Sequence, residues 1–375
     1  MAGRIVLFGA TGYTGRLAAD AFVERGARPV LAARDPQKLS KMAADLGGLE
    51  IQTADVSRPE TARALVEEGD VLVSTVGPFT QFGDAALDAA IEAKAAAYID
   101  STGESGFIRD LWEHAGPRAA ASGTGLLTAC GYDYVPGNLA AALALREAGE
   151  DATRVEVGYF TVGPLSRDAM SGGTGASALA SFMEPSFGFH GGRIVDEPRA
   201  RHIAQFDVGG KQRPAISLGG TEQLSLPRVH PGLEDVDVFL GWFGPASRVV
   251  QGVSLAGSAV MKLPGASSAV RGATRRFVRS SGQGPDATAR AKLGSHVVAR
   301  ACDGGGRVLA EAHVEGVNGY TFTGRILAWA AIHALEPGLQ GKGALGPVEA
   351  FGVDALEAGC AECGLEARVL QRSTG

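Results

Sequence analysis

The sequence predicts an α/β protein whose N-terminal part is a doubly wound parallel sheet, followed by a second α+β domain. Two observations predict this. An apolar run from Arg4 to Phe8 leads directly into Gly9-Ala10-Thr11-Gly12-Tyr13-Thr14-Gly15, and apolar runs then alternate with helical patterns to about residue 129. A length of 375 residues suits two domains, and 45% hydrophobic and 20% charged residues are typical of a soluble globular protein.

Three regularly spaced glycines predict a dinucleotide-binding turn of the Rossmann type. Gly9 permits a tight turn, Gly12 lets the backbone approach a pyrophosphate, and Gly15 lets the helix pack closely on the strand. The phosphates would lie at the positive end of the following helix. The cofactor-binding residues predicted in this turn are Gly9, Thr11, Gly12, Tyr13, Thr14 and Gly15.

Further strands and helices continue the pattern. Strands are expected at 28–33, 50–54, 70–75, 97–100 and 125–129, and helices at 16–25, 35–46, 59–68, 83–95 and 138–146. Ligands of such sheets bind at the carboxyl ends of the strands. Residues there are therefore predicted to contact cofactor (Asp55, Thr75, Val76, Gly77, Pro78 and Phe79) or substrate (Ser101 and Glu104), although Glu104 could equally be a capping carboxylate.

The choice of cofactor is predicted at the end of the second strand. A carboxylate there favours NADH, because it holds the ribose 2′-hydroxyl, whereas a 2′-phosphate requires positive charge. The first polar residue after the strand is Arg34, and Lys38 follows one helical turn later. Asp35, placed before Pro36, fits a helix cap. We therefore expect NADPH rather than NADH.

Several motifs together resemble one family. GATGYTG, AARDPQKL, TVGPFTQFG, YIDSTGE, GYDYVPGNLA and SGGTGAS, with the later Gly319-Tyr320-Thr321-Phe322-Thr323-Gly324, occur in an order similar to the saccharopine dehydrogenase-like superfamily, and most of all to its trans-acting enoyl reductases. The resemblance implies three regions. These are a Rossmann domain at 1–137, an α+β substrate and oligomerisation domain at 138–317, and C-terminal helices at 318–375 that pack back on the first domain.

The loop from Gly131 to Gly137 carries the predicted catalytic residues. Saccharopine reductases have Gly-x-Asp-Pro-Gly here, whereas two residues separate Asp133 from Pro136 in this chain. The departure fits the enoyl reductase-like branch better. Hydride transfer needs orientation and a proton donor. Tyr132 and Tyr134 are candidate donors and Asp133 could hold water or a substrate group, while packing of both tyrosines in the core is the alternative.

The second domain gives weaker signals. Strands are expected at 154–162, 204–208, 215–218 and 236–243, forming an antiparallel sheet, and a helix at 176–183. A Ser/Gly-rich turn is predicted to contact substrate or to cap that helix; its residues are Ser171, Gly172, Gly173 and Thr174. Arg271, Arg275, Arg276 and Arg279 form either a solvated helix face or a docking surface for an acidic acyl carrier protein.

The remaining features limit the function further. A formal charge of −6 argues against nucleic acid, four cysteines are too few for a disulfide scaffold, and the seven histidines show no ligand spacing, so no metal is expected. The apolar stretch at 236–263 is interrupted by charges and Gly244-Pro245, which argues for a substrate cleft rather than a membrane span. A cytoplasmic protein and a homo-oligomer are the default expectations.

These observations lead to one expected function and two alternatives. We expect an NADPH-dependent oxidoreductase that transfers hydride to the C=C bond of an unsaturated acyl or related conjugated substrate, which a carrier protein could present. The first alternative is an imine or C–N bond reductase of the saccharopine type, for which Arg193, Arg199 and Arg201 are candidate carboxylate ligands by charge alone. The second is a dinucleotide sensor or scaffold without turnover.

Overall fold

The computed structural model describes residues 3–164, 186–261 and 284–371. The chain forms two compact units, and neither is one continuous stretch. Unit 1 contains residues 1–135 and 319–363, and unit 2 contains residues 136–318 and 364–375. The predicted regions differ from these units mainly at the C-terminus, because the expected third region is divided between the two.

Unit 1 is built on a seven-stranded parallel sheet, which confirms the predicted fold class. The strand order is β15-β6-β5-β4-β1-β2-β3. The order reverses beside β1, as expected for a doubly wound sheet, and this point is where dinucleotides bind in such folds. The strands are β1 (Ile5–Phe8), β2 (Val30–Ala33), β3 (Ile51–Thr53), β4 (Val71–Ser74), β5 (Ala97–Asp100), β6 (Gly125–Leu127) and β15 (Gly343–Ala344).

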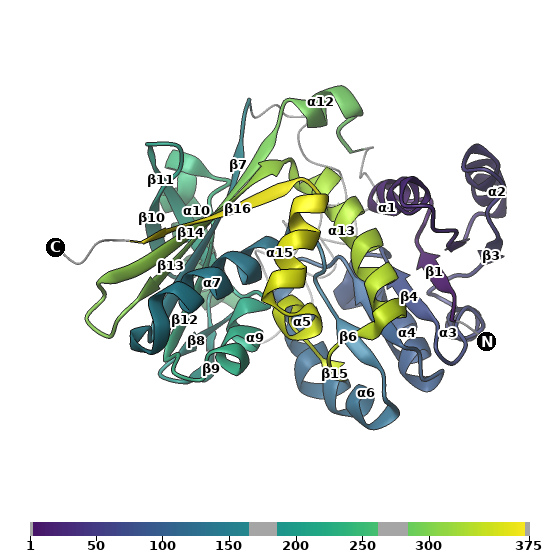
Figure 1. The fold of residues 1–375 in the computed structure, drawn as a ribbon, viewed down its shortest axis with the longest axis horizontal. Helices are drawn as coiled ribbons and strands as arrows, with labels where there is room; N and C mark the ends of the chain where they lie inside the picture. The colour runs from purple at the N-terminus through teal and green to yellow at the C-terminus, as the bar shows by residue number, and fades with distance from the viewer. Residues whose placement is uncertain (1–2, 165–185, 262–283, 372–375) are drawn as a thin grey trace. The chain divides into compact units, whose positions relative to one another are not determined.

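Helices cover both faces of this sheet. Right-handed crossovers place the β1-to-β2 and β4-to-β5 connections on opposite faces. On one face α1 packs along α13, which also contacts β4 and β5, and Figure 1 shows α1 beside α13. The helices are α1 (Tyr13–Glu24), α2 (Pro36–Asp45), α3 (Pro59–Arg63), α4 (Phe79–Glu92), α5 (Ser105–Asp110), α6 (Gly116–Ser122), α13 (Gly319–His333), α14 (Pro347–Phe351) and α15 (Val353–Glu362).

Unit 2 contains a mixed sheet, which corrects the antiparallel sheet expected from the sequence. Its longest path is β10-β11-β12-β7-β13-β14-β16, and β12 runs parallel to β7 with Asp235 opposite Arg154. Parallel neighbours need a long connection, and β8 to β11 and α9 (Glu222–Val229) lie between these two strands in the sequence. The strands are β7 (Arg154–Val162), β8 (Ser186–His190), β9 (Arg193–Glu197), β10 (Ile203–Asp207), β11 (Gln212–Leu218), β12 (Asp235–Leu240), β13 (Gly294–Cys302), β14 (Val308–Val317) and β16 (Leu365–Gln371).

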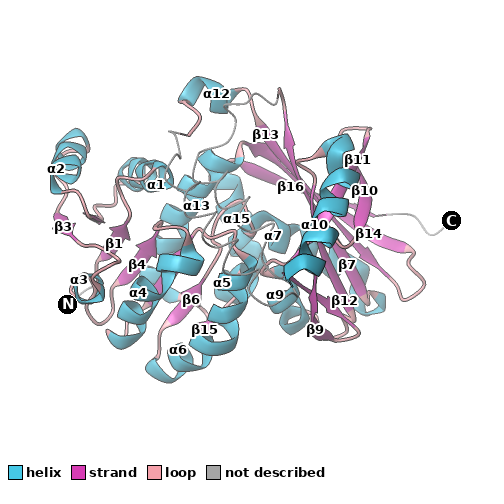
Figure 2. Cartoon of the chain, turned by 180° about the vertical axis from the view of Figure 1, so that it is seen from behind, coloured by secondary structure: helices cyan, strands magenta, loops and turns pink. Residues whose placement is uncertain are grey.

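The helices of unit 2 are α7 (Val135–Ala148), α9 (Glu222–Val229), α10 (Ser247–Met261) and α12 (Ala287–Ala291). Figure 2 shows α10 over the β10–β11 side of the sheet, and α10 contacts β11. None of the helices in the described ranges is long and apolar enough to cross a membrane.

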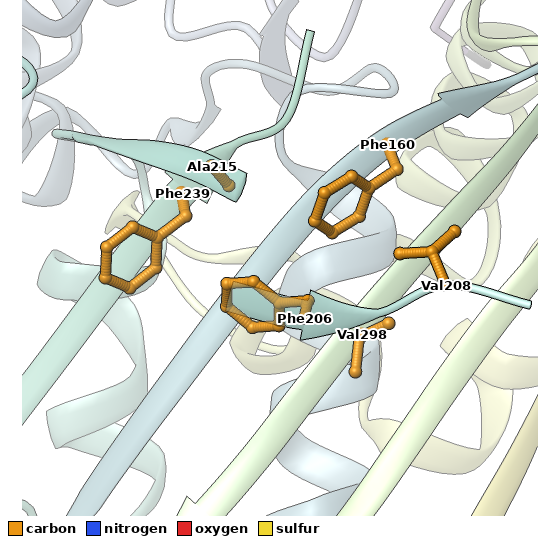
Figure 3. Packing of buried hydrophobic residues seen from close by; sticks show 6 residues of the cluster. All are labelled: Phe160, Phe206, Val208, Ala215, Phe239 and Val298. Carbon is orange, nitrogen blue, oxygen red and sulfur yellow. The ribbon is translucent and has the colours of Figure 1, made fainter. Parts of the chain in front are cut away.

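An aromatic cluster forms the core on one face of this second sheet. Phe160, Phe206 and Phe239 come from β7, β10 and β12 and are at most 2% exposed. Neighbouring ring centroids are 5.6 Å apart in tilted or edge-on pairs, a favourable geometry for aromatic packing. Figure 3 shows these rings with the aliphatic side chains that complete the cluster, Val208, Ala215 and Val298. The cluster therefore ties β7, β10, β11, β12 and β13 together.

The last strand corrects the expectation of C-terminal helices alone. α13, α14 and α15 belong to unit 1, but β16 pairs with β14 in the sheet of unit 2. The apolar residues Leu365, Ala367 and Val369 recur at every second position, which is the period of a strand.

Candidate functional site

The glycine turn after β1 has the geometry that its spacing predicts. Gly9 adopts φ +88°, and a Cβ atom there would lie 2.7 Å from the Thr75 Oγ1 atom. A Cβ atom at Gly15 would lie 2.2 Å from the carbonyl oxygen of Gly9. Gly9 therefore allows contact between the loops after β1 and β4, and Gly15 allows α1 to approach the turn closely.

The start of α1 is suited to an anion. Gly12 is the N-cap residue, so no side chain satisfies the first N–H groups of the helix, and its first turn carries no acidic residue. Gly12 is exposed, while Thr11, Tyr13 and Thr14 beside it are half-buried. Backbone donors at the positive end of a twelve-residue helix form a typical phosphate site. These residues fit the pyrophosphate of a dinucleotide.

Positive charge follows β2. Arg34 is exposed and forms no hydrogen bond or ion pair within the described residues. Asp35 faces the helix instead, since its carboxylate accepts the backbone N–H groups of Gln37 and Lys38 at 3.0 and 3.1 Å. The Lys38 ammonium is 73% exposed and lies 3.9 Å from the Asp35 carboxylate. The Arg34 guanidinium at the end of β2 is therefore available to a ligand.

Asp55 follows β3, the edge strand next to β2. It accepts the backbone N–H of Ser57 at 2.9 Å and the Ser57 hydroxyl at 2.8 Å. These bonds to the ionised form lower the pKa of Asp55, with a smaller contribution from the charges of Arg58 and Arg34. Asp55 is thus an ionised carboxylate in the neighbourhood of Arg34.

Glu104 connects the loops that follow β4 and β5. Its carboxylate accepts the backbone N–H groups of Phe79 and Thr80, both at 2.9 Å, and the Thr80 hydroxyl at 2.7 Å. The side chain is buried. This capping explains why α4 begins at Phe79 rather than near Gly83, and it shapes the turn formed by Val76, Gly77 and Pro78. Ser101, in the same β5 loop, is half-buried.

Asp100, the last residue of β5, is a fully buried carboxylate that organises the next loop. It accepts the backbone N–H groups of Thr102 and Ala129 at 2.9 and 3.0 Å and the Thr128 hydroxyl at 2.8 Å. Burial raises its pKa to about 6, although these hydrogen bonds oppose the shift. Asp100 therefore fixes the end of β6, from which the predicted catalytic loop departs.

The three predicted catalytic residues occupy different environments. Tyr132 and Tyr134 are core residues, 6% and 2% exposed. The Asp133 Oδ1 atom is buried and has no hydrogen-bond partner in the described residues, while a Cβ atom at Gly103 would lie 3.7 Å from Oδ2. Burial raises the pKa of Asp133 to about 6. Asp133 thus lies beside the β5 loop with a carboxyl oxygen still available for a hydrogen bond.

The motif from Gly319 to Gly324 at the start of α13 contacts both the glycine turn after β1 and the predicted catalytic loop. The Thr323 hydroxyl accepts the backbone N–H of Tyr132 at 3.0 Å. The Tyr320 ring packs edge-on against Tyr13, with centroids 5.3 Å apart. A Cβ atom at Gly324 would lie 2.8 Å from Leu17, so α13 packs very closely on α1. Sequence reasoning placed this motif in the family pattern but did not assign these contacts, because 191 residues separate Thr323 from Tyr132.

Three groups of predicted residues lie outside the described ranges. These are the Ser/Gly-rich turn of Ser171, Gly172, Gly173 and Thr174, the helix expected at 176–183, and the basic stretch from Arg271 to Arg279. The structure thus describes the glycine turn, the β2 and β3 ends and the loops of Thr75, Ser101 and Asp133, all at the carboxyl edge of one sheet.

A parallel doubly wound sheet with a glycine turn and an uncapped helix at its switch point is a dinucleotide-binding domain. Comparison with known proteins agrees. A family model described as NAD(P)H-binding matches residues 9–170.

The sequence is also similar to trans-acting enoyl reductases of mycobacteria. A putative trans-acting enoyl reductase of Mycobacterium tuberculosis is 37% identical over 181 residues, covering 47% of this chain and 43% of that protein. A trans-acting enoyl reductase of Mycobacterium ulcerans is 33% identical over 201 residues, covering 52% of this chain and 48% of its own length. The chain thus matches slightly less than half the length of these relatives.

One solved structure matches nearly the whole chain. Apo saccharopine dehydrogenase (L-Glu forming) from Saccharomyces cerevisiae aligns with a TM-score of 0.60 over 98% of this chain and 100% of that one, at 13% identity. At this identity the match concerns the fold alone. The resemblance inferred from the ordered motifs is confirmed as sequence similarity to trans-acting enoyl reductases over about half the chain and as similarity of fold to saccharopine dehydrogenase.

Proposed function

We propose that this protein is an NADPH-dependent reductase that transfers hydride to the C=C bond of an unsaturated acyl or related conjugated substrate. The observation that supports it most directly is the carboxyl edge of the unit 1 sheet. At this edge, the N-terminus of α1 at Gly12 has no side-chain cap and the Asp133 Oδ1 atom is buried without a hydrogen bond in the described residues. Both residues lie in unit 1, within the part of the chain that matches the NAD(P)H-binding family model. The substrate class rests on the names of the mycobacterial relatives.

Cofactor binding is assigned to three groups of residues. The backbone at Gly12 to Gly15 would hold the pyrophosphate, Arg34 would pair with a 2′-phosphate, and the loop of Thr75 to Phe79 would border the nicotinamide. When bound, the reduced nicotinamide supplies the hydride. Lys38 and Asp55 would contribute to the charge around the adenosine ribose.

The chain itself must then supply orientation and a proton. Burial gives Asp133 a pKa of about 6, so part of the carboxyl population holds a proton near neutral pH. Its Oδ1 atom has no partner in the described residues, and we assign it the proton for the substrate α-carbon. The more buried Tyr132 and Tyr134 would position this loop. Ser101 would contact the substrate, and Glu104 would act through the loop that it holds.

The first experiment tests the cofactor. Binding of NADPH and NADH is measured by the change in nicotinamide fluorescence for the wild type and for Arg34→Ala, with Lys41→Ala as an exposed control on α2. A charge-assisted pair contributes about 1.5–3 kcal/mol, so NADPH affinity should fall about 10- to 150-fold. NADH affinity should change little. Equal losses for both cofactors would contradict the role given to Arg34.

The second experiment tests the reaction. NADPH oxidation is followed with enoyl thioesters, free or attached to an acyl carrier protein, with cyclic imines, and with amino acid plus keto acid pairs. We expect oxidation only with the enoyl thioesters, and Asp133→Asn should reduce kcat more than it raises KM. Turnover of imines alone would favour the saccharopine-like alternative. Tight NADPH binding without any turnover would favour a sensor.

A further inference from the structure

Three neighbouring strands of unit 2 bring one histidine and three carboxylates onto one face of the sheet. β8 and β9 form a hairpin in which Ser186 lies opposite Glu197, and β8 pairs with β12 through Phe189 and Val236. Side chains alternate along a strand, and directly opposite residues share a face. The face away from Phe189 and Val236 therefore carries His190, Glu197, Asp235 and Asp237.

The potential ligand atoms of this cluster converge. The Nε2 atom of His190 lies 3.6 Å from Glu197 Oε2 and 4.0 Å from Asp237 Oδ1. The Nε2 atom of His202, just before β10, lies 3.9 Å from the same Glu197 oxygen. One ligand atom from each of His190, Glu197 and His202 lies within 4.8 Å of the others. Atoms so spaced can share a central point no more than about 2.4 Å from each, close to metal–ligand bond lengths.

Two of these atoms are buried without a hydrogen bond. The Glu197 side chain is only 4% exposed, and neither its Oε2 atom nor His190 Nε2 has a partner in the part of the chain that the structure describes. A buried carboxylate oxygen in this state is costly, and 3.6 Å is too long for a hydrogen bond. The same separation suits two ligands of one cation.

The surrounding charges leave this position open. Arg154 donates to the other oxygen of Asp237, Oδ2, at 2.8 Å. Arg201 Nη1 lies 3.9 Å from Glu197 Oε2, but its side chain is 52% exposed. His190 Nδ1 lies 3.1 Å from Asp235 Oδ1, an arrangement that directs the second ring nitrogen, Nε2, toward Glu197. A carboxylate behind a histidine in this way is typical of metal-binding histidines.

Space is provided by a glycine and by a cavity. A Cβ atom at Gly188 would lie 2.6 Å from His190 Nε2 and 2.8 Å from Glu197 Oε1, so any other residue would fill the centre of the cluster. His190, His202 and Asp237 also line a cavity of about 600 Å³. An ion could enter from this side and keep a water molecule.

A second histidine cluster in the same unit shows the opposite situation. His296 Nε2 and His313 Nδ1 are hydrogen-bonded to each other at 2.8 Å, and His313 Nε2 bonds to Glu311 Oε1 at 2.8 Å. These nitrogens already have partners at hydrogen-bonding distance. The unpartnered atoms therefore single out the first cluster.

We propose that His190, His202 and Glu197 bind a divalent transition-metal ion, with Asp237 or water as a further ligand. Two imidazoles and one or two carboxylates are the donor set of zinc and its neighbours, whereas magnesium and calcium prefer oxygen alone. The prediction of no metal rested on linear spacing. Pairing of β8 with β9 and β12 brings together residues that this spacing did not connect.

Metal binding is measured on the full chain after treatment with EDTA. Calorimetric titration with Zn²⁺ should give one ion per chain, and Co²⁺ should produce the intense visible absorption of four- or five-coordinate cobalt. Asp235→Asn, which removes only the partner of His190 Nδ1, should weaken binding about 10- to 100-fold. His190→Ala, His202→Ala and Glu197→Gln, which remove ligands, should each weaken it more.

Two further variants separate the site from general effects. Gly188→Ala retains every ligand but fills the centre, and it should also abolish the cobalt spectrum. His114→Ala removes an exposed histidine of unit 1 and should bind as the wild type does. Absence of stoichiometric Zn²⁺ binding to the wild type would overturn the proposal, whether or not the variants fold. Binding that persists in His190→Ala, or that is lost in His296→Ala instead, would overturn it as well.

Discussion

The carboxyl of Asp133, whose Oδ1 atom is buried, makes the stability of unit 1 depend on pH in a way that one substitution can isolate. Burial raises the pKa of Asp133 from 3.8 to about 6. Below about pH 3 this carboxyl is protonated in both the folded and the unfolded chain. As the pH rises, the unfolded chain loses its proton first, so stability falls until about pH 6 and then remains constant.

The size of the effect follows from the shift. A difference of about 2 pKa units corresponds to about 3 kcal/mol in the free energy of unfolding, as an upper value. Asp133→Asn places a neutral side chain of the same shape at this position. The variant should therefore be more stable than the wild type at pH 7.5, by up to about 5–10 °C in Tm, and nearly equal to it at pH 4.

The assay is thermal unfolding followed by circular dichroism and calorimetry at half-unit steps from pH 4 to 8. Asp151→Asn, at an exposed position in unit 2, serves as the matched control and should leave Tm unchanged at every pH. Asp100 also makes stability depend on pH, but it does so equally in the wild type and in Asp133→Asn. Its contribution therefore cancels when the Tm values of the two proteins are subtracted. A loss of stability in Asp133→Asn at pH 7.5, or a gain of equal size at pH 4, would refute the assignment of burial as the dominant cause.

Three other substitutions test contacts described above. Glu104→Gln weakens the charge-assisted cap of α4 and should lower the unfolding free energy by about 1–2 kcal/mol, with increased hydrogen exchange at Phe79 and Thr80; unchanged exchange there would argue against the cap. Gly15→Ala, whose Cβ atom would meet the Gly9 carbonyl at 2.2 Å, should reduce NADPH affinity at least tenfold and cost about 1–3 kcal/mol, and an unaltered titration would contradict the close packing. Phe206→Ala should destabilise unit 2 by about 3–5 kcal/mol in urea unfolding, and a loss below 1 kcal/mol would mean that the aromatic cluster is not its core.

The Rossmann unit could be predicted from the sequence because its signals are local. The run from Arg4 to Phe8 and the glycines that follow specify a strand, a turn and a helix without help from distant residues. Asp35 before Pro36 likewise specified a cap, and the structure confirms it. Boundaries were less accurate where a distant side chain decides them, as at Phe79, where the cap is supplied by Glu104.

The second unit was harder to predict because its pairings are long-range. The strand at 154–162 was predicted with its observed bounds, but its parallel partner β12 lies about 80 residues later. The hairpin of β8 and β9 was not predicted, although Gly191 and Gly192, both with positive φ, are a recognisable hairpin signal. Without that hairpin, the sequence does not show that Asp235 and Asp237 lie on the same face of the sheet as His190.

The division of the chain between two units limits how the protein can be dissected. A truncated chain that stops at residue 135 would lack α13, and with it the packing on α1 and the hydroxyl that holds the Tyr132 backbone. Deleting only the last strand would expose the edge of β14 and favour aggregation. A minimal dinucleotide-binding module would therefore require excision of residues 136–318 and a new connection between Val135 and Gly319.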